Sequence, residues 1–187
     1  LVYNGEIYNY VELRRYLESL GITGWRGTSD TEVLLALLVR EGVSGLRRVD
    51  GMFAFGFFDA RRNTLTLGRD HLGEKPLYYA RRNGQLVGFA SETRALVRAN
   101  LGGHSFDYQG LSLLMRKGSI TPPHTQYEDI RLLKPGHTIV VDLATGSWSE
   151  SAYWRHPFHD ALVAPRSKTV SQNQIETLKS VIRESFS

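Results

Sequence analysis

The first ten residues, LVYNGEIYNY (Leu1–Tyr10), are the stretch from which the rest of the chain is interpreted. The opening three residues are apolar like a strand, and we expect that strand to run into Asn4-Gly5, a pair typical of tight turns. A helix is predicted next, from about Tyr10 to Leu20, because its apolar residues recur at helical spacing and a glycine follows. The segment therefore predicts the end of a strand followed by a helix.

Working outward, helical and strand patterns combine in a way that predicts an α+β domain. A second helix, from about Asp30 to Glu41, is apolar nearly all round, so we expect it to lie inside the fold. The middle and later parts of the chain are rich in short apolar runs bounded by turn residues. Strands are predicted at 52–58, 64–69, 77–80, 85–90, 130–133, 137–143 and 148–154, and helices at 92–99, 108–117 and 173–187.

The composition excludes several classes of function. The net charge is +4, from 23 basic and 19 acidic residues, and the arginine pairs are scattered, so we do not expect a nucleic-acid partner. No run approaches the roughly 20 apolar residues of a membrane helix, so a membrane is not expected as a partner either. The absence of cysteine excludes disulfides and any thiol nucleophile within these residues. A cytoplasmic location is the expectation.

Ordered motifs then carry a resemblance that covers about residues 1–155. They are NGEIYN at 4–9, SDTE at 29–32, DGMFAF at 50–55, RDHLGEKPLYY at 69–79, FASE at 89–92, LKPGH at 133–137 and YW at 153–154. Together they resemble the class II glutamine amidotransferase domain of glutamine-hydrolysing asparagine synthetases, which is an Ntn hydrolase. The resemblance implies a four-layer sandwich of two antiparallel sheets between helices, here lacking its first strands.

The same resemblance implies a glutamine site. Asn4, through its side-chain amide, and Gly5, through its backbone N–H, would form the oxyanion hole, donating to the substrate amide oxygen as negative charge develops there. Asp30 would bind the α-ammonium of glutamine, because a carboxylate is the natural partner of that group. Glu6 would line the same site through its backbone or its carboxylate.

Structural explanations stay open for several of these residues. Asn4-Gly5 can be a tight turn, and Asp30 can be an acid that favours a helix N-terminus, where Ser29 and Glu32 have capping-box spacing. The dense motif of the 75–79 segment is interpreted as mainly structural. His71 and His137 have no metal-ligand spacing with other His, Asp or Glu residues, so no metal site is predicted in this chain.

Three features of the family do not occur among these 187 residues: the N-terminal cysteine, the segment with an arginine for the substrate carboxylate, and the Ser-Gly-Gly-x-Asp-Ser loop. We therefore expect a truncated piece that is inactive alone, with a partial glutaminase at 1–155 and a linker at 156–172. Residues 173–187 would begin a synthetase (ATP-pyrophosphatase) domain. No cofactor is expected in this piece; ATP and Mg²⁺ would serve the synthetase domain.

The parent enzyme is expected to release ammonia from glutamine for ATP-dependent amidation of aspartate. Its partners would be glutamine and its own synthetase domain, and a homodimer is left open. Glu74 stands where the resemblance predicts a branched apolar residue, so another acceptor carboxylate, such as a sugar acid in polysaccharide synthesis, is an alternative. A degenerate, non-catalytic scaffold domain is a third interpretation.

Overall fold

The structure is a computed structural model that describes residues 1–156 and 172–184, and the chain divides into two units, Leu1–Arg155 and His156–Ser187. The first unit combines helices with two antiparallel sheets, which confirms the predicted α+β class. Its strands are β1 (Val2–Ile7), β2 (Gly51–Asp59), β3 (Thr64–Arg69), β4 (Tyr78–Arg82), β5 (Gln85–Ala90), β6 (Ile130–Leu132), β7 (His137–Asp142) and β8 (Trp148–Ala152). Its helices are α1 (Tyr10–Ser19), α2 (Asp30–Glu41), the 3-10 helix η1 (Gly42–Arg48), α3 (Thr93–Arg98) and α4 (Tyr108–Lys117).

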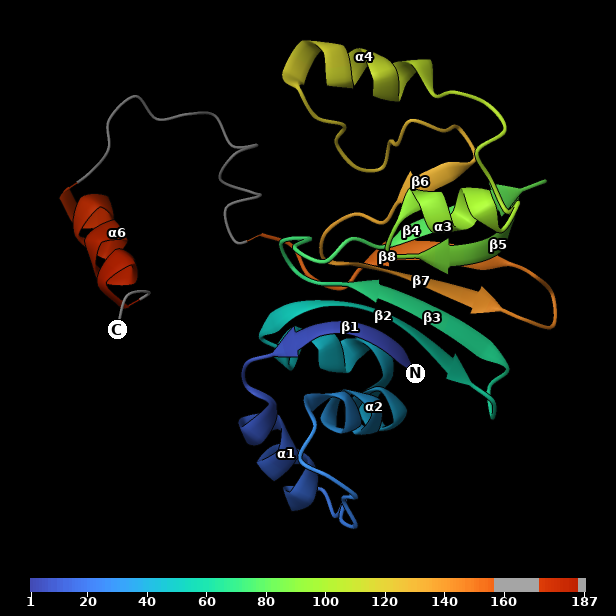
Figure 1. Ribbon diagram of the computed structural model, residues 1–187. Helices are drawn as coiled ribbons and strands as arrows, with labels where there is room; N and C mark the ends of the chain where they lie inside the picture. Colours follow the sequence, from blue (N-terminus) through green and yellow to red (C-terminus); the bar gives the residue numbers. More distant parts are fainter. Residues whose placement is uncertain (157–171, 185–187) are drawn as a thin grey trace. The chain divides into compact units, whose positions relative to one another are not determined.

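The two sheets pack face to face between helices. One sheet has the strand order β1-β2-β3-β7-β8 and the other has the order β5-β4-β6. Helices α1 and α2 cover the outer face of the larger sheet, and α3 covers the smaller one (Figure 1). This arrangement confirms the predicted sandwich of two antiparallel sheets between helices.

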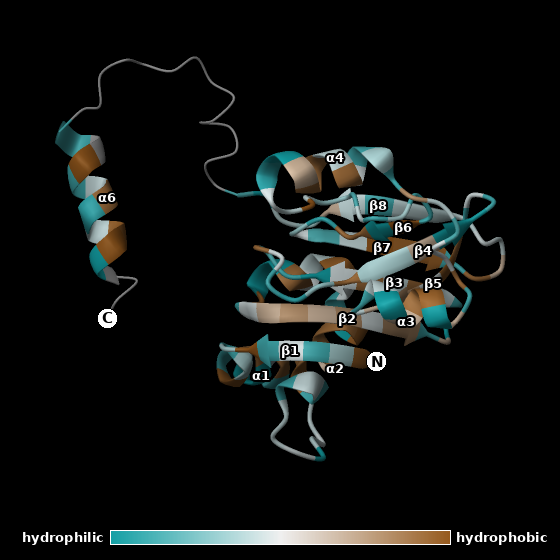
Figure 2. Ribbon diagram, turned by 45° about the horizontal axis from the view of Figure 1, so that its top comes forward, coloured by the Kyte–Doolittle hydropathy of each residue, from teal (hydrophilic) through white to brown (hydrophobic). Residues whose placement is uncertain are grey.

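Strand β2 lies at the centre of the core because its side chains alternate between the two layers it separates. Phe53, Phe55 and Phe57 pack in the cluster formed with α1 and α2. Ala54, which points to the opposite face, packs with Leu67 and other residues between the two sheets. The hydrophobic colouring of β2 in Figure 2 reflects this burial on both faces.

The alternative interpretation of Asn4-Gly5 as a tight turn is wrong, because β1 continues through both residues to Ile7. The register pairs Gly5 with Phe53 of β2, and the two backbones approach closely there. A Cβ atom on Gly5 would lie 2.1 Å from the carbonyl oxygen of Met52, which no side chain tolerates. The glycine therefore permits a tight strand pairing rather than a change of direction.

Helix α2 is only partly inside the fold, which corrects the expectation that its whole apolar circumference is covered. Val33, Leu34, Leu37 and Leu38 are buried against the sheet, whereas Val39 is 56% exposed. A helix on the outer face of a sheet buries one side, so the remaining apolar residues stay at the surface.

The second unit is described by itself. Its helix α6 (Gln172–Glu184) has an exposed apolar stripe formed by Ile175, Leu178, Val181 and Ile182 (Figure 2). Most of the predicted linker, 157–171, and the last three residues lie outside the described residues. Within the described ranges, no helix has the length and apolar character needed to cross a bilayer.

Candidate functional site

Strand β1 is the edge strand of the larger sheet, and its outer edge is where predicted site groups meet. The N–H of Tyr8 donates to the carbonyl of Asp50, which faces it across the pairing, at 2.8 Å. Because N–H groups alternate in direction along an antiparallel strand, those of Gly5 and Ile7 point away from β2. In this direction the N–H of Ile7 donates to Asp30 Oδ2 at 3.0 Å. The Gly5 N–H and the Asp30 carboxylate therefore share one open strand edge.

Asp30 occupies the first position of α2, where the helix dipole favours a negative charge. Its Oδ2 also accepts a hydrogen bond from the Tyr3 hydroxyl at 2.7 Å. Burial acts to raise the pKa of the Asp30 carboxyl, but the hydrogen bonds from Tyr3 and Ile7 outweigh it and hold that pKa below its ordinary value. Asp30 is therefore an anion at neutral pH, held at the strand edge.

The start of α2 differs in detail from the predicted capping box. Ser29 caps the helix as expected, because its Oγ accepts from the N–H of Thr31 at 3.1 Å. The Glu32 carboxylate instead accepts the N–H groups of Arg26 and Gly27, at 2.9 and 3.0 Å. Glu32 thus holds the loop before the helix rather than its N-cap.

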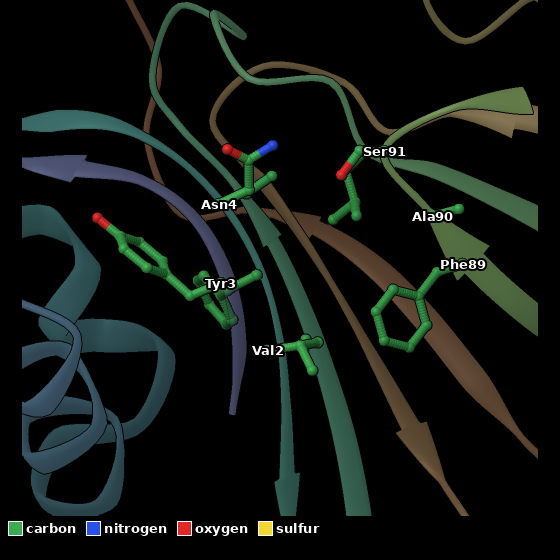
Figure 3. Close-up of a pocket in the computed structure, with 10 residues that line it drawn as sticks. Val2, Tyr3, Asn4, Phe89, Ala90 and Ser91 are labelled. Atoms are coloured by element: carbon green, nitrogen blue, oxygen red, sulfur yellow. The ribbon is translucent and has the colours of Figure 1, made fainter. Parts of the chain in front are cut away.

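Asn4 projects from the opposite face of β1 to Tyr3, as Figure 3 shows. It lines a pocket of about 220 Å³ whose other walls come from β2, from the end of β5 with Ser91, and from Leu77. Glu6, two residues on, has the same strand parity as Asn4 and is exposed. Asp30 does not line this pocket. The structure thus brings Gly5 and Asp30 to one edge, and it places Asn4 and Glu6 on the adjoining face.

A buried charged pair that sequence reasoning did not single out anchors the loop between β3 and β4. The Asp70 carboxylate is 1% exposed. It accepts four backbone N–H groups, from Phe53, Leu72, Glu74 and Lys75. The signal for this role was a charged Arg-Asp pair at the end of a buried strand, where a charge needs several partners.

Arg69 completes the anchor by donating to backbone carbonyls. Its guanidinium reaches the carbonyl of Lys75 at 2.8 Å and that of Leu133 at 2.6 Å, and it also bonds Gly73. Burial lowers the pKa of Arg69. The hydrogen bonds of Arg69 and Asp70 therefore fix the conformation of the 69–79 loop. This agrees with the structural interpretation of residues 75–79.

Comparison with known proteins identifies the family of the first unit. Residues 1–154 match the family model of the glutamine amidotransferase domain. The glutamine-hydrolyzing asparagine synthetase 1 of Bacillus subtilis (strain 168) is 37% identical over 141 residues, covering 75% of this chain and 22% of that protein. Asparagine synthetase B of Escherichia coli (strain K12) is 44% identical over 103 residues, covering 52% of this chain and 17% of that protein. The chain thus spans a minor part of these relatives.

Among solved structures, the glutamine phosphoribosylpyrophosphate amidotransferase of B. subtilis, in complex with ADP and GMP, superimposes with a TM-score of 0.59. It is 20% identical, and the match covers 83% of this chain and 29% of that one. This likeness shows the fold, which is that of the Ntn-hydrolase glutamine amidotransferases. From the family match over nearly all of the first unit, the chain belongs to the glutamine amidotransferase domain family, with relatives among the glutamine-hydrolysing asparagine synthetases.

Proposed function

We propose that residues 1–155 are the glutaminase portion of an asparagine synthetase, which releases ammonia from glutamine for the amidation of aspartate. The observation that carries this proposal is the shared edge of β1. There an outward N–H at Gly5 stands beside the anionic Asp30, which is fixed by the next outward N–H along the strand, that of Ile7. The amide oxygen of glutamine needs a donor such as the Gly5 N–H, and its ammonium group needs an anion such as Asp30.

The spacing of these groups fits glutamine. Two residues along a strand separate the N–H groups of Gly5 and Ile7 by about 6.6 Å. The five bonds from the amide oxygen of an extended glutamine to its α-nitrogen span about 6 Å. One glutamine can therefore place its amide oxygen at Gly5 and its ammonium group at Asp30.

The chemistry follows from where charge develops. When a nucleophile attacks the side-chain amide, the carbonyl oxygen gains negative charge, and the N–H donors of Gly5 and Asn4 stabilise it. Collapse of this intermediate expels ammonia and leaves the glutamyl group on the nucleophile, which water then releases as glutamate. The printed sequence has no cysteine, so a thiol nucleophile in this proposal lies outside it.

The use of the ammonia belongs to other residues of the full-length protein. The names of the relatives, glutamine-hydrolyzing asparagine synthetases, support aspartate as the acceptor, and they do not favour the sugar-acid or scaffold alternatives. Within residues 1–156 and 172–184, no three potential ligand side chains gather as a metal ion would require. We propose that ATP and Mg²⁺ serve a synthetase domain of the parent enzyme.

The test is glutamate release by the full-length gene product and by its Asn4→Ala variant. The loss of one oxyanion donor should lower kcat by about 10²- to 10³-fold. Asn9→Ala is the matched control, because its amide joins Arg48 and Asp50 at 2.8 and 2.9 Å and so should affect stability rather than kcat. An Asn4→Ala variant with normal turnover contradicts the assignment of the oxyanion hole. A full-length protein that releases no glutamate contradicts the proposed function.

A further inference from the structure

The hydroxyl of Tyr3 has no part in the reaction just described, yet it makes one of the shortest side-chain contacts at the edge of β1. Tyr3 points to the helical side of the strand, away from Asn4 (Figure 3). Its ring packs against the cluster between the sheet and α1 and α2, so the side chain is anchored there. The hydroxyl emerges from this packing to donate to Asp30 Oδ2 at 2.7 Å.

The two oxygens of Asp30 are treated differently by their surroundings. Oδ2 takes both short hydrogen bonds, from Tyr3 and from the N–H of Ile7 at 3.0 Å. The contacts of Oδ1 with the hydroxyls of Ser29 and Thr31 are longer, at 3.4 Å each. Two donors on one oxygen restrain the carboxylate plane and leave the other oxygen able to accept a strong charge-assisted bond.

We infer that Tyr3 is a positioning residue for substrate recognition, which fixes Asp30 so that Oδ1 receives the α-ammonium of glutamine. This inference rests on the proposed function and deepens it, because it assigns the selection of an amino acid amide over a simple amide to a Tyr3–Asp30 pair. Tyr3 itself touches neither the ammonium group nor the reacting carbonyl. It acts only through the orientation and charge of Asp30.

Tyr3→Phe is a precise perturbation because it keeps the buried ring and removes only the donor. In the full-length enzyme, KM for glutamine should rise about tenfold, the worth of one hydrogen bond to a charged group, while kcat stays near the parent value. The readout that a general structural defect would not give is a comparison of ligands. Glutaramate, which is glutamine without its α-amino group, should inhibit the variant and the parent with the same inhibition constant.

The pH profile gives a second readout. The hydrogen bond from Tyr3 is among the contacts that lower the pKa of Asp30, against the opposing effect of burial. Its removal should raise that pKa, so protonation would abolish ammonium binding at a higher pH. The acid limb of kcat/KM for glutamine should therefore move to higher pH in Tyr3→Phe. An unmoved acid limb, or an equal loss of affinity for glutamine and glutaramate, overturns the positioning role.

Tyr16→Phe is the matched control. Tyr16 also donates its hydroxyl to a carboxylate, that of Glu41, but this pair joins α1 and α2 and does not include the edge of β1. It should leave KM, the inhibition constant and the acid limb unchanged. A tenfold rise of KM in Tyr16→Phe as well would show that any lost phenol bond in this layer has the same effect, which refutes a specific role for Tyr3.

Calorimetric titration of glutamine separates this inference from the proposed function. Binding that weakens about tenfold in Tyr3→Phe, in a protein that releases no glutamate, supports the role of Tyr3 and refutes only the proposed hydrolysis. Glutamate release with identical glutamine affinity in the parent and Tyr3→Phe refutes only the role of Tyr3. A full-length protein that does not bind glutamine refutes both.

Discussion

Replacement of Gly5 by alanine is the sharpest test of how the edge of β1 is built. The added Cβ would lie 2.1 Å from the carbonyl oxygen of Met52 and 2.7 Å from the Cα of Phe53. Ordinary contacts between carbon and carbonyl oxygen are about 3.3 Å or longer, so the two strands must separate by roughly 1 Å at this point. Both obstacles are backbone, which cannot rotate away as a side chain can.

The cost follows from the pairs on either side of Gly5. Asn4 faces Ala54 and Glu6 faces Met52 in the register, and hydrogen-bonded pairs exchange two bonds each. A separation of about 1 Å takes such bonds beyond their useful range, and each is worth about 1 kcal/mol net. Gly5→Ala should therefore destabilise the domain by about 3–4 kcal/mol. For a domain of this size that corresponds to a fall in Tm of roughly 6–16 °C.

The assay is urea unfolding followed by tryptophan fluorescence, with Gly21→Ala as the control. Gly21 has φ +84°, and a Cβ there would meet no atom within 4 Å. Its substitution should therefore cost only the strain of the left-handed backbone, about 1–2 kcal/mol. If Gly5→Ala is no more destabilising than Gly21→Ala, the close pairing of β1 with β2 is not what requires a glycine. In the full-length protein, Gly5→Ala should also lose the proposed glutaminase activity, because the N–H of residue 5 moves with the strand.

Two further predictions concern carboxylates. Asp70→Asn should cost about 3 kcal/mol in urea unfolding, because an NH₂ group would face backbone donors that the buried carboxylate now accepts. The control Asp142→Asn should cost less than about 1 kcal/mol, because that exposed carboxylate accepts the turn N–H groups of Ala144 and Thr145. Equal losses of stability in the two variants would contradict the importance of burial. For Asp30, burial acts to raise the pKa, but hydrogen bonds lower it by more, so the net pKa lies below the ordinary 3.8. The ionised Asp30 therefore stabilises the fold above pH 3.8. The stability difference between the parent and Asp30→Asn should accordingly shrink as the pH falls through the depressed folded-state pKa, and a difference that grows on acidification would refute the sign.

The secondary structure was predictable where periodicity and stop signals agreed. The second helix is an example, since it runs from Asp30 to Glu41 in the structure as in the prediction, with Ser29 as its N-cap. The strands predicted at 77–80 and 85–90 are another, because Asn83 and Gly84, which lie between β4 and β5, both adopt positive φ. In such places the local chemistry admits one conformation, and the tertiary structure does not need to override it.

The continuation of β1 through Asn4-Gly5 was not predictable from local pattern. The dipeptide has turn chemistry, but the outcome depends on Met52 and Phe53, which lie far away in the sequence and approach only once the sheet forms. Sequence pattern cannot state the distance between two backbones. The sequence indicated that residue 5 needs a glycine, while the structure shows that the close approach of β2 requires it.

For the candidate site, the sequence indicated the chemical type of each predicted residue but not how the fold holds it. Asp30 was expected at a helix start and is there. Its attachment to Tyr3 and Ile7 was not foreseen, because these contacts join α2 to β1 across more than twenty residues of chain. Residue type indicated the charge of the group, whereas only the fold shows which of its oxygens is already occupied.

The buried pair Arg69 and Asp70 links the fold to the site in a way that a list of catalytic residues would omit. Their hydrogen bonds fix the loop that passes from β3 in one sheet to β4 in the other. Leu77, at the end of this loop, forms a wall of the pocket that Asn4 also lines. Because Asp70 also accepts the N–H of Phe53, the residue opposite Gly5, one buried carboxylate connects the loop to the strand pairing. Charge at this motif therefore acts on the proposed glutamine site through position, and its loss should disturb the pocket and the edge of β1 together.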